Sequence, residues 1–491
     1  MSWLTLLVFS PIIGMLVLAF IPKDQKTVLK TVGTLATIVP LVVSFIVYSL
    51  YQGGTNLAET RDWIFFGGGA FEIKYELGVG GFALLLVLLT TIVSTLSALA
   101  ATFQIKKEWK SYYIFFLLLE LGMLGVFTSE NLILFFVFFE LTLIPMFFLI
   151  GKWGFVEREK AAYSYLIYNG IGSAILLIVF STLLAKTGTT NIDALTSIMS
   201  MDHPAISEDF KMGILIALLI AFGVKLPIIP LHTWMVRVHV NAPTAVVMIH
   251  AGILLKIGAY GLIRFGLGMF PAQFEKISVL VAILGLVNLL YGAFLALVQT
   301  ELKHVFAYSS VSHMGIVLLG VAAMNEAGVQ GAIFQTISHG LIAALLFLLV
   351  GILHERTGTT IIDNLGGLAK AMPLTAGFLL ATAMASLGLP GMSGFVSEFM
   401  AFLGLFEEMP ILAAIGTLGI ILTAVYLLRA VLGVTFGRTE KALEGLQDVK
   451  GLELIPVIAL LAFIILIGVY PTVLTDTLQL TLETILQGIG G

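Results

Sequence analysis

The chain has 491 residues, of which 59% are hydrophobic and 11% are charged, and its mean hydropathy is +1.07. Soluble domains carry about 25% charged residues, so this composition indicates a polytopic helical membrane protein. The formal net charge of −4 gives no reason to expect a nucleic acid as partner. The chain has no cysteine, which excludes thiolate-ligated zinc, iron–sulfur clusters, disulfides and thiol catalysis within it.

Apolar runs long enough to cross a bilayer recur along the whole chain, and they predict about fourteen transmembrane spans and no soluble domain. The first run lacks a basic flank, so we expect a retained helix and not a cleaved signal peptide. Residues 54–77 are predicted to form an extended or hairpin-forming loop. The predicted spans cover 2–21, 30–51, 78–101, 112–128, 130–151, 161–185, 211–235, 243–264, 277–299, 304–323, 328–353, 372–405, 411–436 and 452–470.

Basic residues gather in the loops after the odd-numbered spans. Since cytoplasmic loops are the basic ones, both termini are predicted on the outer side of the membrane. The basic residues of these loops are Lys23, Lys26, Lys30, Lys106, Lys107, Lys110, Lys152, Arg158, Lys160, Arg237, Lys303, Arg356, Lys370, Arg438, Lys441 and Lys450.

Lys225 is a charged residue at predicted membrane depth, followed by Pro227 and Pro230. Because proline has no backbone N–H, we expect the carbonyls of Gly223 and Leu226 to be free beside the ammonium. An ionisable residue in such a place is a candidate carrier of protons or ions.

Glu120, Glu140 and Lys256 also lie inside predicted spans. Each has a structural alternative: a protonated, hydrogen-bonded carboxyl for the glutamates, and an ammonium that snorkels to the interface for the lysine. A charged carboxylate at this depth needs a cationic partner, and the order of the spans offers Lys225 or Lys256.

Three histidines, His250, His313 and His339, fall inside predicted spans. Imidazole suits a proton relay, although a single buried histidine is more often a helix-to-helix hydrogen bonder. No histidine or carboxylate spacing matches a metal site, so no metal is expected. The chain has no P-loop, dinucleotide fingerprint or nucleophile elbow, so we expect no bound ATP or NADH.

Two predicted spans are broken in the same way. Pro227 and Pro230 interrupt the seventh, and Pro390 interrupts the twelfth shortly before Glu398. An offset of five spans inverts the second unit, which predicts two inverted five-helix repeats, spans 4–8 and 9–13. The chain is therefore predicted to be a single membrane domain with N-terminal spans in 1–111, repeats in 112–266 and 276–436, and a last span and tail in 451–491.

Several motifs resemble the antiporter-like membrane subunits of respiratory complex I, the proton-pumping NADH:quinone oxidoreductase. The resemblance covers essentially the whole chain and is most specific in 225–265. The matching motifs are Phe139-Glu-Leu-Thr-Leu-Ile-Pro-Met, Pro230-Leu-His-Thr-Trp, Ala251-Gly-Ile-Leu-Leu-Lys-Ile-Gly, Ala307-Tyr-Ser-Ser-Val-Ser-His-Met-Gly, Ile337-Ser-His-Gly-Leu and Leu389-Pro-Gly-Met-Ser-Gly-Phe-Val-Ser-Glu-Phe-Met.

Within that family, the resemblance implies the M-type subunit, equivalent to mitochondrial chain 4. Glu398 stands where the other complex I type and the sodium/proton antiporters typically have lysine, and the chain ends too soon for the type with a long lateral helix. One departure is Met235-Val-Arg-Val-His, where many bacterial members have Leu-Pro-Asp-Ala-His.

The resemblance implies a mid-membrane proton path in which Lys225 is the central carrier and Glu140 modulates it. By analogy Lys256 passes the proton on, His313 and His339 continue the path, and Glu398 is the terminal exchange group. It also implies a multi-pass protein of a bacterial inner membrane.

No cofactor is expected in this chain. Flavin, iron–sulfur clusters and quinone are expected in partner subunits, which include two other antiporter-like subunits. The alternatives are a subunit of a multisubunit sodium/proton antiporter and a helical scaffold or quinone-site component with incidental buried charges.

Overall fold

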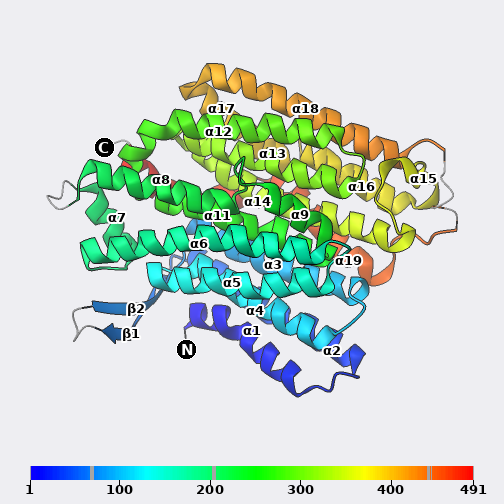
Figure 1. Cartoon of the computed structure of the whole chain (residues 1–491), viewed down its shortest axis with the longest axis horizontal. Coiled ribbons are helices and arrows are strands. Elements are labelled where there is room, and N and C mark those ends of the chain that lie inside the picture. The colour runs from blue at the N-terminus through cyan, green and yellow to red at the C-terminus, as the bar shows by residue number, and fades with distance from the viewer. Residues whose placement is uncertain (1, 67–70, 202–205, 439–442, 444, 490–491) are drawn as a thin grey trace.

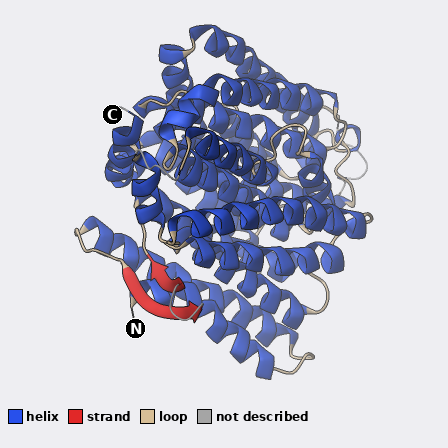
Figure 2. Ribbon diagram, turned by 60° about the vertical axis from the view of Figure 1, so that its left-hand side comes forward, coloured by secondary structure: helices blue, strands red, loops and turns tan. Residues whose placement is uncertain are grey.

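The computed structural model describes residues 2–66, 71–201, 206–438, 443 and 445–489. Long helices run side by side along one direction, and a single two-stranded hairpin lies at one end of the bundle (Figures 1 and 2). The described part holds twelve helices that are long and apolar enough to cross a membrane. The predicted fold class, an all-α polytopic membrane protein, is therefore confirmed, while the total of about fourteen spans stays a prediction.

The N-terminal part contains the only two strands in the part of the chain that the structure describes. They pair antiparallel, which confirms the hairpin predicted in 54–77, while residues 67–70 of that loop lie outside the described residues. The elements of this part are α1 (Trp3–Phe20), α2 (Lys26–Gln52), β1 (Glu59–Phe66), β2 (Phe71–Leu77), α3 (Gly81–Gln104) and α4 (Trp109–Thr128).

The middle of the chain contains the first interrupted span, which consists of α8 and α9. The next span is one rod from Thr244 to Leu267 in which α-helical turns alternate with the π-helical segments η2 and η3. The elements are α5 (Leu132–Trp153), α6 (Arg158–Thr187), α7 (Ile192–Ser200), α8 (Glu208–Lys225), α9 (Thr233–Asn241), α10 (Thr244–Ile249), η2 (His250–Leu254), α11 (Leu255–Gly261) and η3 (Leu262–Leu267).

The C-terminal part contains the second interrupted span, which consists of α16 and α17, as the position of Pro390 predicts. The predicted tail is a helix, α20, whose mean hydropathy is lowered by Asp476, Gln479, Glu483 and Gln487. The elements are α12 (Pro271–Val298), α13 (Leu302–Ala322), α14 (Glu326–Thr357), η4 (Ile362–Asn364), α15 (Leu368–Ala371), α16 (Pro373–Ser386), α17 (Ser393–Glu408), α18 (Pro410–Thr435), η6 (Gly451–Glu453), α19 (Leu454–Val469) and α20 (Thr472–Ile489).

The bundle has a fully buried centre and a lipid-facing rim. The rod Thr244–Leu267 and helix α14 are buried over the whole of their apolar windows, whereas α1, α2 and α19 bury 39% or less of theirs. Polar and charged side chains on the central helices are thereby shielded from lipid, where they would be costly.

Two turns at opposite ends of the bundle share one hydrogen-bond pattern. In each turn a threonine, Thr187 or Thr357, donates to the carbonyl four residues earlier, at 2.8 and 2.9 Å. A backbone bridge then joins each turn to the start of a preceding helix, α5 in one case and α13 in the other. Helix α7 follows the first turn and α15 follows the second, and they lie at opposite ends of Figure 1. Inverted repeats would produce such a match, although the repeats and their boundaries stay predictions.

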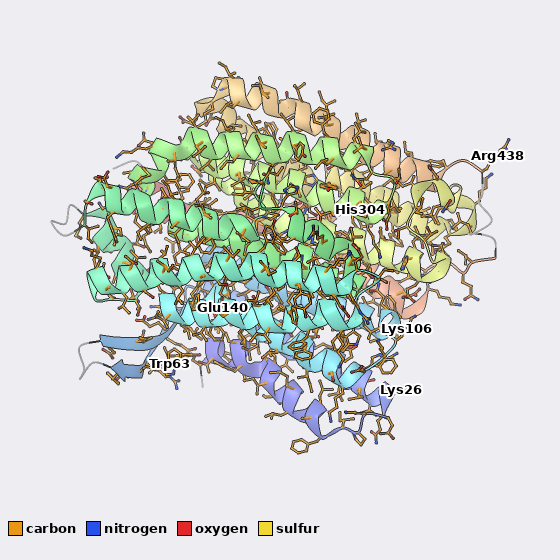
Figure 3. The ribbon with its side chains drawn as sticks, in the orientation of Figure 1. Lys26, Trp63, Lys106, Glu140, His304 and Arg438 are labelled. Atoms are coloured by element: carbon orange, nitrogen blue, oxygen red, sulfur yellow. The ribbon has the colours of Figure 1, made fainter. Side chains whose placement is uncertain are left out.

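Basic side chains mark one end of the bundle. Figure 3 places Lys26, Lys106 and Arg438 at the end away from Trp63 in the hairpin. The predicted orientation makes this the cytoplasmic end. Lys441, which belongs to the same predicted set, lies outside the described residues.

Candidate functional site

Lys225 ends helix α8 at the first interruption, and its side chain is buried, with 2% of its surface exposed. Its Nζ lies 4.8 Å from the ring centroid of Phe139 on α5 and 5.6 Å from that of Tyr165 on α6. Cation–π attraction to these rings partly replaces the hydration that the ammonium loses. The lysine could be identified from the sequence, but its aromatic neighbours depend on how α5 and α6 pack against α8.

The backbone at this interruption is more fully bonded than the sequence predicts. The carbonyl of Gly223 accepts a hydrogen bond from the N–H of Ile228 at 2.9 Å, and the carbonyl of Val224 accepts one from Nε1 of Trp234 at 3.1 Å. The prediction of a free Gly223 carbonyl is wrong, because the chain turns after Pro227 and brings the next N–H within reach.

Glu140 is half-buried and Glu120 on α4 is fully buried. Glu140 follows Phe139 on α5, the helix that packs against Lys225, and Figure 3 places it away from both ends of the bundle. Among the described residues, neither carboxylate has a cation within 4.0 Å, and the buried Oε1 of Glu140 and both oxygens of Glu120 lack a hydrogen-bond partner. Helix α5, which carries Glu140, therefore lies next to Lys225, but the two side chains form no ion pair. Within the part of the chain that the structure describes, Glu120 forms no hydrogen bond or ion pair with another predicted site residue.

Four other predicted site residues are neighbours of one another in the order Lys256, His339, His313 and Glu398. Nζ of Lys256 on α11 donates to the carbonyl of Ala251 at 2.6 Å and lies 2.7 Å from Nδ1 of His339 on α14. The ring centroid of His339 is 5.5 Å from that of His313 on α13, and Nε2 of His313 is 3.6 Å from Oε1 of Glu398 on α17. Lysine, two histidines and a carboxylate thus succeed one another across four helices.

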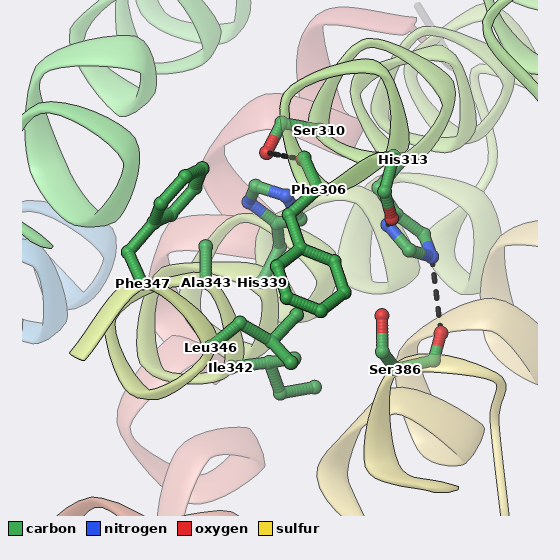
Figure 4. A pocket seen from close by; sticks show the side chains of 10 residues that line it. Phe306, Ser310, His313, His339, Ile342, Ala343, Leu346, Phe347 and Ser386 are labelled. Atoms are coloured by element: carbon green, nitrogen blue, oxygen red, sulfur yellow. Dashed lines mark hydrogen bonds between the residues drawn. The ribbon is translucent and has the colours of Figure 1, made fainter. Parts of the chain in front are cut away.

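His313 and His339 face a common cavity of about 10 Å³ (Figure 4). This is about the room that one water molecule needs. Nε2 of His313 lies 3.1 Å from the carbonyl of Ser386, which is an acceptor only, so this nitrogen carries the proton and Nδ1 is the free base. Nδ1 lies 3.3 Å from Oγ of Ser309, whose hydroxyl in turn accepts from Tyr426 at 2.9 Å.

A buried pair of histidines lies next to Tyr165, one of the rings beside Lys225. Nε2 of His239 is 2.9 Å from Nδ1 of His250, and both residues are fully buried. The His250 ring packs against Tyr165 at 6.0 Å, and Tyr165 is also the ring beside Lys225. His250 was predicted to lie within a span. The sequence did not indicate that His239 lies within a span, because the apolar run ends near residue 235. In the structure the interrupted span continues through α9 to Asn241.

Among the residues that the structure describes, no group of three or more His, Asp or Glu side chains could hold a metal ion. The expectation that this chain binds no metal and no cofactor is based on the sequence alone.

A line of buried lysine, histidine and carboxylate side chains on interrupted helices is typical of ion-translocating membrane proteins. The chain belongs to the NADH:quinone oxidoreductase/Mrp antiporter transmembrane family, whose model matches residues 129–423.

Its relatives confirm the M-type prediction. The chain is 38% identical over 502 residues to NADH-quinone oxidoreductase subunit M of Rhodobacter capsulatus, with 99% of this chain and 96% of the relative covered. It is 39% identical over 492 residues to NAD(P)H-quinone oxidoreductase chain 4 1 of Picosynechococcus sp., covering 97% of this chain and 90% of the relative.

Solved structures share the fold. A chain of respiratory complex I from Thermus thermophilus with bound NADH superimposes with a TM-score of 0.87 and 28% identity, covering 99% of this chain and all of that one. A chain of the Mrp complex from Dietzia sp. matches with a TM-score of 0.85 and 22% identity over the full length of both chains, which shows the fold alone.

Proposed function

We propose that this chain translocates protons as a membrane subunit of a complex I type oxidoreductase that passes electrons from NADH or another donor to quinone. The observation that carries the proposal is the succession of the buried side chains Lys256, His339, His313 and Glu398. On the other side, Lys225 lies beside Tyr165, whose ring packs against His250. The relatives named as subunit M or chain 4 of quinone oxidoreductases support it.

Glu140 modulates Lys225 by its charge. At an effective dielectric constant of about 20, two unit charges about 4 Å apart interact by about 4 kcal/mol, and the interaction weakens in inverse proportion to their distance. Moving one charge against about 150 mV costs about 3.5 kcal/mol. A shift of α5 or α8 that changes the distance between the two groups therefore changes the affinity of Lys225 for a proton by a useful amount.

The proton then passes from Lys225 past Tyr165 and the histidine pair of His239 and His250 to Lys256. His339 and His313 take it on to Glu398, with the cavity of about 10 Å³ admitting one water between the two rings. Flavin, iron–sulfur clusters and quinone belong to partner subunits of the complex, and their redox reactions drive the path. The termini face the outer side.

The test compares two lysines on helix α8. Lys225→Met and Lys211→Met make the same change in two buried side chains, but Lys211 lies near the other end of the helix, where it pairs with the half-exposed Glu208 at 3.1 Å. The complex that contains each variant is purified and reconstituted in vesicles, and protons moved per electron are measured. Lys225→Met should lose coupled transport, and Lys211→Met should keep it. If Lys225→Met moves as many protons per electron as Lys211→Met and the unchanged protein, Lys225 is not a proton carrier.

A further inference from the structure

A second cavity, of about 710 Å³, is lined by α7 and by the loops on both sides of the β1–β2 hairpin, which lie at the end of the bundle away from α15 (Figure 1). Its walls come from the end of α2, the start of α3, and parts of α7, η3 and α20. The ionisable side chains that line it are Glu130, Asp193, Arg264 and Asp476. Three carboxylates outnumber one guanidinium, so the cavity favours cations over phosphate or other anions.

The inner wall of this cavity is a hydrogen-bonded cluster around Arg264. Its guanidinium pairs with the Glu130 carboxylate and contacts the Tyr260 hydroxyl, and the side chains of Arg264 and Glu130 are each 19% exposed. The Tyr260 ring packs against Phe82 and Phe127, with centroids 5.4 Å away in both cases. Burial raises the pKa of the Glu130 carboxyl, and the positive charge of Arg264 opposes that shift. Glu130 thus lies at the boundary between the buried cluster and the cavity.

The same wall adjoins the proposed proton path. Lys256, Tyr260 and Arg264 follow one another at intervals of four residues on the central rod, so they lie on one helix face within about 12 Å. The Lys256 ammonium points in the opposite direction, toward Ala251 and His339. Tyr260 and its two phenylalanine neighbours therefore close the cavity from Lys256 in this structure.

We infer that the proposed path branches at Lys256: one branch runs through His339 and His313 to Glu398, and this cavity is the vestibule of a second branch, which leads from Lys256 to the outer surface. Tyr260 with the Arg264–Glu130 pair is the gate of that second branch. When the gate opens, Lys256 gives a proton to the Tyr260 hydroxyl oxygen, and the tyrosine passes its own proton to the Glu130 carboxylate. Glu130 then releases the proton into the vestibule, and Lys256 is left neutral. This inference rests on the proposed function, because it needs Lys256 to carry protons.

Labelling of single cysteines tests the vestibule, since the chain has no cysteine of its own. Thr196 on α7 lines the cavity, and its exposed neighbour Ser197 does not. Complexes with Thr196→Cys, Ser197→Cys or the unchanged chain are treated from the outer side with a bulky, membrane-impermeant thiol reagent. Labelled Thr196→Cys should lose quinone-coupled proton transport several-fold relative to its unlabelled form, while the other two should not. Unchanged transport after complete labelling of Thr196→Cys would overturn the inference.

A charge variant provides a second measurement at the gate. Glu130→Gln should lower the number of protons moved per electron several-fold, whereas Glu483→Gln, the same change at an exposed site on α20 outside the cavity, should not. Wild-type stoichiometry in Glu130→Gln would also overturn the inference. If Lys225→Met fails while Glu130→Gln and labelled Thr196→Cys pump normally, the proposed function stands and the vestibule does not. Normal pumping in Lys225→Met would instead contradict the proposed function itself.

Discussion

The side-chain amide of Asn288 donates a hydrogen bond to the carbonyl of Pro227 across 3.1 Å. Its Oδ1 accepts the N–H of Ile229 at 2.8 Å, so one side chain satisfies both sides of the interruption that follows Lys225. Asn288 is fully buried on α12, a helix of the predicted second repeat. The position of Lys225 thus depends on a helix from the other half of the chain.

Asn288→Leu should weaken both the fold and the transport. It leaves the part-buried N–H of Ile229 and the buried carbonyl of Pro227 without this partner, which costs about 1–3 kcal/mol. We expect a lower melting temperature and, in the fraction that remains folded, fewer protons moved per electron. Val287→Leu, at the neighbouring lipid-facing position, is the control and should change neither. Normal stoichiometry in folded Asn288→Leu would show that this residue has no part in placing Lys225.

Glu140→Gln should abolish most coupled transport, because an amide cannot change the electrostatic free energy of Lys225 as a carboxylate does. Glu140→Asp keeps the charge and moves it back by about one methylene, so it should retain part of the activity. Proton uptake coupled to quinone reduction, measured side by side for the two variants, checks this. Full coupling in the glutamine variant would exclude Glu140 from the mechanism.

Replacements of Glu398 should rank in a particular order. Glu398→Gln should impair turnover strongly, because an amide beside His313 neither binds nor releases a proton. Glu398→Lys should be milder, because an amine can still carry a proton.

The structural alternative for Glu398 is a hydrogen bond to the backbone around Pro390, and it reverses this order. Oε2 of Glu398 lies against Gly388, but no hydrogen bond joins the Glu398 carboxyl to the backbone among the described residues. Its ion-pair neighbour within 4.0 Å is His313, which favours the exchange role. We would measure quinone-coupled proton uptake in both variants. A higher uptake in Glu398→Gln than in Glu398→Lys would exclude Glu398 as a proton-exchange group.

Glu301, just before α13, should make the stability of the protein depend on acidic pH. Its carboxylate accepts hydrogen bonds from Nδ1 of His304 at 2.9 Å and from Thr360 at 2.5 Å. The His304 bond above all, with the Thr360 bond and nearby positive charge, lowers the pKa of Glu301 from its usual 4.5 to about 2, against the opposing effect of burial.

Because this pKa is lower in the folded state, the stabilisation is complete above about pH 4.5 and is lost as the pH falls toward 2. The melting temperature should therefore fall more steeply over this interval in the unchanged protein than in Glu301→Gln. The exposed Glu326 at the start of α14 provides the control, and Glu326→Gln should keep the wild-type slope. Identical slopes in all three would show that Glu301 does not contribute.

The long spans could be predicted from the sequence because the thickness of a bilayer sets their length. The predicted span 277–299, for example, overlaps most of α12 (Pro271–Val298). Helix α7 could not be predicted in this way, since it has only nine residues. Lys225, Lys256 and Glu398 could be selected because a charge inside an apolar run is expensive. The roles of His239 and Asn288 depend on contacts between helices far apart in the chain, which no local pattern reveals.

The two π-helical segments, η2 and η3, flank the short helix α11 that carries Lys256. A π turn closes its hydrogen bond over one residue more than an α turn. If η2 rewound to α geometry, the helix beyond it would rotate by about one residue, roughly 100°. Lys256 would then leave His339 and turn toward a different set of helices, with its backbone still fully hydrogen-bonded. A change in the winding of this rod would therefore give Lys256 different neighbours without any change in charge.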